Sequence, residues 1–166
     1  MDVDQPQADQ AWNRRARGET AVQRLDRNWS SLLQELRVVQ TGVQLLTGFL
    51  LTLPFQVGFV RLQHDMRLVY LASVSCAVSA TVLLVAPVAL HRVLFRQRRL
   101  ASLVSAAHRF AYAGLLFLGA ALVGITVLVF DAVAGDRTAL IAGGIATAVF
   151  VAFWCVIPVM IRVSRR

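Results

Sequence analysis

The sequence predicts an all-α membrane protein, a bundle of four transmembrane helices. Hydrophobic residues make up 57% of the chain and the mean hydropathy is +0.63, above the apolar content of about 45–50% that is typical of soluble domains. The excess is gathered in four blocks, each with at least 20 residues that carry no formal charge. About 20 apolar residues are needed to cross the hydrocarbon core of a bilayer, so each block is long enough to span it once.

The predicted spans cover residues 38–60, 68–90, 110–130 and 138–161. Helices are expected because a lipid-exposed backbone must satisfy its own hydrogen bonds, and a helix does so within one segment. The blocks are too long and too evenly apolar for barrel strands, which alternate over about ten residues. A soluble bundle of four such helices would have almost no polar face, so residues 21–166 are expected to form one membrane domain.

Two different segments precede the first span. Residues 1–20 are polar and are expected to form a disordered tail. Apolar side chains then recur at helical spacing among charged ones, at Leu25, Trp29, Leu32, Leu33 and Leu36. This pattern predicts an N-terminal amphipathic interfacial helix that runs into the first span. Ser31 and Gln34 have the spacing of a capping box at a helix start.

The distribution of basic residues predicts the orientation. All 17 basic residues are Arg, and 14 of them lie in the N-terminal segment, the middle loop with its flanks, and the C-terminus. Only Arg61, Arg67 and Arg137 lie in the two short loops. Because cytoplasmic loops carry the Lys and Arg excess, we expect both termini and the basic middle loop in the cytoplasm. The absence of Lys, with abundant Ala, Val, Leu and Gly, indicates a bacterial source, and therefore a multi-pass protein of the bacterial inner membrane.

The middle loop, HRVLFRQRRLASLVSAAHR, is also expected to be helical. Its cationic face would lie against anionic lipid headgroups, an attraction worth about 1 kcal/mol for each Arg near the surface. Since topology accounts for these charges, no nucleic-acid partner is expected. The expected partners are the lipid bilayer, anionic headgroups at the Arg-rich inner face, and either a second copy of the chain or a larger membrane complex.

The first span carries the clearest polar seam. Gln40, Gln44 and Thr47 stand at positions i, i+4 and i+7, which places them on one helix face, and Glu35 lies at the inner mouth of the span. One interpretation is hydrogen bonding between helices, worth about 0.6–2 kcal/mol per contact. The other is a polar lining for an ion or small solute. The first is favoured, because a conduit usually needs polar groups on more than one helix.

Small residues four positions apart predict close helix packing in the third and fourth spans. The pairs are Ala120 with Gly124, Gly144 with Ala148, and Ala148 with Ala152. Such pairs let helix backbones approach closely, and the short connection between the spans predicts a tight antiparallel hairpin. The same spacing would serve a homodimer, so Gly124, Gly144 and Ala148 are candidate packing residues.

The sequence lacks the residues that several classes of function require. The middle of every span is free of Asp, Glu, Arg and His, whereas ion-coupled transporters usually keep such residues in the bundle. Cys76 and Cys155 lie inside apolar blocks and have no metal-ligand spacing. There is no phosphate-binding glycine loop, pair of catalytic carboxylates or nucleophile triad. We therefore expect no enzymatic activity, no catalytic residue, no metal and no cofactor.

Residues 32–55, LLQELRVVQTGVQLLTGFLLTLPF, resemble the signature of a family of uncharacterised small membrane proteins from actinobacteria. Residues 86–96, APVALHRVLFR, and residues 63–65, QHD, resemble other recurring segments of that family. The resemblance extends from about residue 25 to the end, and it implies a four-span membrane protein described as a domain of unknown function.

Some members of that family carry an automatic label of sodium:proton antiporter. The label implies a titratable group that sodium ions and protons compete for, yet the side chains of Gln40, Gln44 and Thr47 do not titrate. Glu35 carries a carboxyl group, but it lies at one mouth only. Two functions therefore fit the sequence. The first is a non-enzymatic structural or accessory bundle, and the alternative is a small transporter or channel component.

Overall fold

The computed structural model describes residues 18, 20–94 and 100–164, and in these it is helical throughout apart from short turns. Four helices are long and apolar enough to cross a membrane, and they comprise Asp26–Phe55, His64–Leu90, Ala106–Ala134 and Asp136–Ile161. The predicted four-helix membrane bundle is confirmed, and the chain is an integral membrane protein. The predicted disordered tail lies almost wholly outside the described residues.

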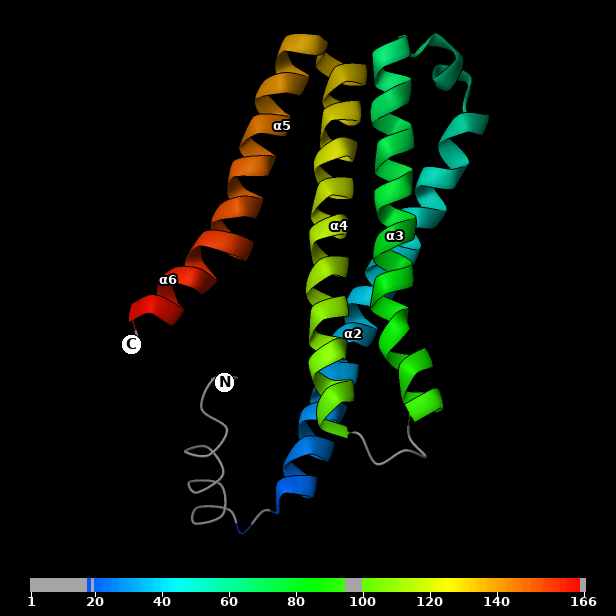
Figure 1. Ribbon diagram of the computed structural model, residues 1–166. Helices are drawn as coiled ribbons and strands as arrows, with labels where there is room; N and C mark the ends of the chain where they lie inside the picture. The colour runs from blue at the N-terminus through cyan, green and yellow to red at the C-terminus, as the bar shows by residue number, and fades with distance from the viewer. Residues whose placement is uncertain (1–17, 19, 95–99, 165–166) are drawn as a thin grey trace.

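Three helices form the body of the bundle and the fourth leans away from it (Figure 1). Helices α3 (His64–Leu94) and α4 (Leu100–Ala134) run side by side, and α2 (Ala21–Thr52) crosses them obliquely. Helix α5 (Asp136–Val151) packs on α4 near the α4–α5 turn and diverges from it further along. A π-helical turn then joins α5 to α6 (Ile157–Ser164). We call the end of the bundle that carries the α2–α3 and α4–α5 connections the short-loop end.

Helix α2 begins earlier than the sequence pattern predicts. Its capping box is formed by Thr20 and Gln23: the Gln23 N–H donates to Thr20 Oγ1 at 3.3 Å, and the Thr20 N–H donates to Gln23 Oε1 at 2.9 Å. The predicted capping box at Ser31 and Gln34 is wrong, since both residues lie inside the helix. The reciprocal pair satisfies the backbone N–H groups of Thr20 and Gln23, two of the free donors at this helix start.

The amphipathic segment before the first span is part of α2 and packs inside the bundle. Trp29, Leu32 and Leu36 are buried and belong to the same cluster as Leu84 of α3 and Ala107 of α4. The sequence predicted that this stripe lies at the membrane interface. Helices α3 and α4 both extend past their predicted spans, and they supply the apolar surface against which the stripe packs.

The first α-helix also ends earlier than the predicted span. The predicted helix ran to Val60, but α2 ends at Thr52 and is followed by the 3-10 turns Leu53–Phe55 and Val57–Arg61. Pro54 has no N–H to continue the helical hydrogen bonds. Gln56 is extended, with φ −84° and ψ 141°, and it separates the two turns.

Glycines allow α4 to approach both of its neighbours. A Cβ on Gly114 would lie 2.8 Å from Leu84 Cγ of α3, and a Cβ on Gly143 of α5 would lie 2.6 Å from Val127 Cγ2 of α4. Gly135, with φ +81°, makes the sharp turn between α4 and α5, a conformation that costs other residues free energy. The predicted antiparallel hairpin is present and is tightest close to this turn.

Candidate functional site

The polar seam of the first span is divided between the bundle interior and the surface. Gln40 and Thr47 are half-buried, whereas Gln44 and Glu35 are exposed. Gln44 follows Val43, which is fully buried, and one residue of helix turns a side chain by about 100°. Gln44 therefore lies at the border of the buried face, although its spacing from Gln40 predicted a common face.

Gln40 joins α2 to the proline-containing segment of α3. Its Nε2 donates to the Leu84 carbonyl oxygen at 2.7 Å. Pro87, buried inside α3, has no N–H to donate to the Leu83 carbonyl, which lies next to the Leu84 carbonyl in the same turn. In membrane helices such carbonyls are satisfied by side chains of neighbouring helices. Gln40 bonds to the carbonyl beside the one that Pro87 leaves without a helical donor, so it ties α2 to the proline-containing turn of α3.

Tyr70 provides a similar contact at the short-loop end. Its hydroxyl donates to the Leu50 carbonyl oxygen at 3.0 Å, and the side chain is only 5% exposed. Leu50 lies four residues before Pro54, so its carbonyl lacks the usual helical donor; it also accepts a bond from the Leu53 N–H. Sequence reasoning missed Tyr70, and the available signal was Pro54, which marks Leu50 as a carbonyl in need of a donor.

Replacing Tyr70 with Phe is expected to lower the free energy of unfolding by about 1 kcal/mol. The loss should be modest because the Leu50 carbonyl keeps its bond from the Leu53 N–H. Thermal unfolding in detergent, followed by circular dichroism, measures the change. Ser75→Ala, whose exposed hydroxyl bonds to the Leu71 carbonyl of its own helix, is the control. Equal stability of the two variants would contradict the role assigned to the Tyr70 hydroxyl.

Most hydroxyl groups within the spans bond to their own helix. Thr47 Oγ1 donates to the Val43 carbonyl at 2.8 Å. The same back-bonding to the carbonyl four residues earlier is made by Thr41, Ser73, Ser75, Thr81, Thr126 and Thr147. Such bonds satisfy the hydroxyl locally. Gln44 differs, because its amide makes no hydrogen bond among the described residues.

Gln44 belongs to a continuous stripe on the side of α2 that the bundle leaves uncovered. The stripe is formed by Thr41, Gln44, Gly48 and Leu51, all of them exposed, and we call it the α2 exposed stripe. Its spacing of three, four and three residues is that of the contact positions in paired helices. A Cβ added to Gly48 would meet nothing within 4 Å, so a second helix has room to approach closely there.

The three candidate packing residues lie in different surroundings. Gly124 lies against α3, where an added Cβ would be 2.0 Å from Ser73 Oγ. Gly144 and Ala148 are exposed, and an added Cβ on Gly144 would meet nothing within 4 Å. The α5 residues that are buried are Ala139 and Gly143. Within this chain, therefore, Gly143 approaches α4, and the predicted role of Gly144 and Ala148 applies only to contacts between chains.

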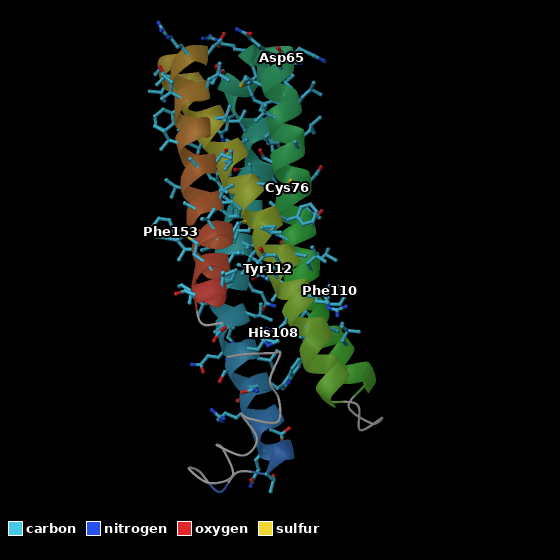
Figure 2. All side chains as sticks on the ribbon, turned by 60° about the vertical axis from the view of Figure 1, so that its left-hand side comes forward. Asp65, Cys76, His108, Phe110, Tyr112 and Phe153 are labelled. Atoms are coloured by element: carbon cyan, nitrogen blue, oxygen red, sulfur yellow. The ribbon has the colours of Figure 1, made fainter. Side chains whose placement is uncertain are left out.

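Ionisable side chains lie toward the ends of the bundle. Asp65 is at the short-loop end, and His108 lies toward the opposite end (Figure 2), where Glu35 and Arg37 are also exposed. Among the residues that the structure describes, no group of three or more His, Cys, Asp or Glu side chains is placed to hold a metal ion. Among the described residues, the side chains with a polar group that are classed as buried include the neutral Tyr70 and Ser73.

Comparison with known proteins identifies a family for this chain. No curated protein and no solved structure matches the chain. A family of unknown function (DUF6328) matches residues 18–158, a range that includes the α2 exposed stripe and the greater part of all four membrane-spanning segments. Its description specifies no source organisms and no transport activity. The chain belongs to this family of unknown function, DUF6328.

Proposed function

We propose that this protein is a non-enzymatic structural protein of the bacterial inner membrane that self-associates through the α2 exposed stripe. The observation that carries the proposal is Gln44, an exposed amide within the apolar segment Asp26–Phe55. An amide that lacks hydrogen bonds in an apolar medium costs several kcal/mol. Contact with another helix that offers a donor and an acceptor removes this cost.

A second copy of the chain is the partner that fits Gln44 best. The Gln side chain both donates and accepts hydrogen bonds, so two copies related by a two-fold axis satisfy each other's Gln44 amide. Gly48, one turn further along α2, lets the two backbones come close. The spacing of the stripe suits helices that cross at about 20°.

The orientation proposed for the protein follows from charge. Of the arginines in the described part of the chain, Arg61, Arg67 and Arg137 are those near the short-loop end. We place this end outside the cell, with both termini in the cytoplasm, because the larger share of the arginines then lies inside. The cytoplasmic arginines would contact anionic headgroups.

The contacts of Gln40 and Thr47 support a structural role over a role in transport. The Gln40 amide donates to the Leu84 carbonyl and the Thr47 hydroxyl donates to the Val43 carbonyl. The Gln40 bond thus joins α2 to α3, and the Thr47 hydroxyl is satisfied within α2. A small transporter or channel component is the second candidate, and it would use Gln44 as a solute contact.

The experiment compares Gln44→Leu with the wild type in liposomes. Energy transfer between donor- and acceptor-labelled copies, at several protein-to-lipid ratios, gives the association constant. Loss of hydrogen bonds worth about 1–2 kcal/mol is expected to weaken association about tenfold. Gln40→Leu should leave association unchanged, because Gln40 bonds within its own chain. Unchanged association of Gln44→Leu would contradict the proposal.

The same liposomes decide between the two candidate functions. Sodium and proton fluxes are measured under an imposed gradient, with wild type and Gln44→Leu side by side. We expect no flux from either protein. A flux of the wild type that disappears in Gln44→Leu would contradict the structural role and favour the transporter or channel component.

A further inference from the structure

A cavity of about 240 Å³ lies at the short-loop end, between the end of α2, the two 3-10 turns, α3 and α4. Its wall is almost entirely apolar and includes Phe49, Leu53, Phe59, Tyr70, Ile125 and Leu128. For comparison, a dry apolar cavity of about 150 Å³ takes up benzene. This cavity is therefore large enough for an apolar ligand or part of a hydrocarbon chain.

The wall of the cavity is held open by contacts that do not involve a ligand. The Tyr70 hydroxyl is fixed by its bond to the Leu50 carbonyl, and the Phe59 ring meets the Tyr70 ring edge-on, with centroids 4.9 Å apart. Arg67 donates from Nε to the Leu62 carbonyl at 3.1 Å and from Nη2 to the Val60 carbonyl at 3.0 Å. These bonds fix the second 3-10 turn against α3, so the cavity is preformed.

The otherwise apolar wall contains one amide side chain. Gln56, in the extended link between the two 3-10 turns, lines the cavity, and its side-chain amide makes no hydrogen bond among the described residues. Leu62, another wall residue, lies between the exposed Arg61 and the nearby Arg67. An apolar ligand with one polar or anionic end matches this lining, because its tail avoids water and its end meets the Gln56 amide donor.

Lipid of the surrounding bilayer is a source of such a ligand. The 3-10 turns bear exposed apolar side chains, with Phe55 87%, Val57 84% and Val60 75% exposed. This surface suits contact with lipid chains rather than with water. We propose that the cavity binds a single acyl chain of an amphiphile, with the polar end of that molecule at Gln56. A free fatty acid and a membrane phospholipid both offer this chemistry.

Native mass spectrometry of the full chain, purified in detergent and titrated with oleic acid, tests the proposal. We expect saturable binding of one molecule per chain. Ala132→Trp places a large side chain on the cavity wall and should weaken binding at least tenfold. Val133→Trp, at the next residue, which is 82% exposed and outside the lining, should bind as the wild type does. Equal binding by the two variants would overturn the proposal.

A second variant tests the polar end and does not depend on filling the cavity. Gln56→Leu should weaken oleic acid binding about tenfold, because a hydrogen bond to a charged group is lost, and should affect a hydrocarbon of similar length without a carboxyl group much less. If oleic acid fails to bind but phosphatidylglycerol binds with the same dependence on Ala132, the acyl chain comes from a phospholipid. Binding of neither molecule would overturn the proposal.

Discussion

Replacing Gly124 with Leu is expected to lower the free energy of unfolding by about 3 kcal/mol. A Cβ at this position would lie 2.0 Å from Ser73 Oγ and 3.2 Å from Ser73 Cβ. Rotation of the Ser73 hydroxyl relieves the first contact but leaves the second, and it also breaks the bond from Ser73 Oγ to the Val69 carbonyl. Helices α3 and α4 must therefore move apart. The buried cluster that contains Leu84 and Ala107 and a second one that contains Ala77 and Ala121 would both lose contacts.

Thermal unfolding of Gly124→Leu in detergent, followed by circular dichroism, measures this effect. Gly144→Leu is the matched control, since an added Cβ there meets nothing within 4 Å, and its stability should stay within about 0.5 kcal/mol of the wild type. In the milder Gly124→Ala variant, the further change Ser73→Ala should recover part of the lost stability. Equal stability of Gly124→Leu and Gly144→Leu would show that the α3–α4 contact is not close.

Replacing Gln40 with Leu is expected to lower the free energy of unfolding by about 1–2 kcal/mol. The change removes the donor to the Leu84 carbonyl in a segment where Pro87 has already removed one helical bond. The same unfolding assay measures the loss. In a Pro87→Ala background the α3 turn can form its own hydrogen bonds, so the effect of Gln40→Leu should shrink. An effect of the same size in both backgrounds would contradict the coupling between Gln40 and the proline turn.

The positions of the four spans were predictable because length and hydropathy are local properties of the sequence. The ends of the first helix were harder to predict. A capping box at Ser31 competed with one at Thr20, and only the structure shows that the helix continues through Ser31. Pro54 cannot continue the helical hydrogen bonds, yet the apolar residues after it extend the hydropathy pattern and conceal the change from α-helix to 3-10 turns.

The hydrogen-bond partners of the polar side chains could not be predicted from the sequence alone. Gln40 bonds to a backbone carbonyl 44 positions away, and nothing in the local pattern of α2 identifies that atom. Spacing placed Gln40 and Gln44 on one face, but the border of that face depends on how α2 crosses α3 and α4. No local pattern around Tyr70 indicates its bond to the Leu50 carbonyl. These contacts are set by tertiary packing, so they required the structure.

Cysteine crosslinking along α2 in native membranes tests self-association most directly. The full chain, with Cys76 and Cys155 replaced by Ala, receives one new cysteine at a time. The positions are Thr41, Gln44, Gly48 and Leu51 of the α2 exposed stripe, with the buried Val43 and Leu50 as controls. A disulfide forms only when the two Cα atoms come within about 7 Å. We predict disulfide-linked dimers from the stripe positions and none from Val43 or Leu50; monomers at all four stripe positions would contradict self-association through α2.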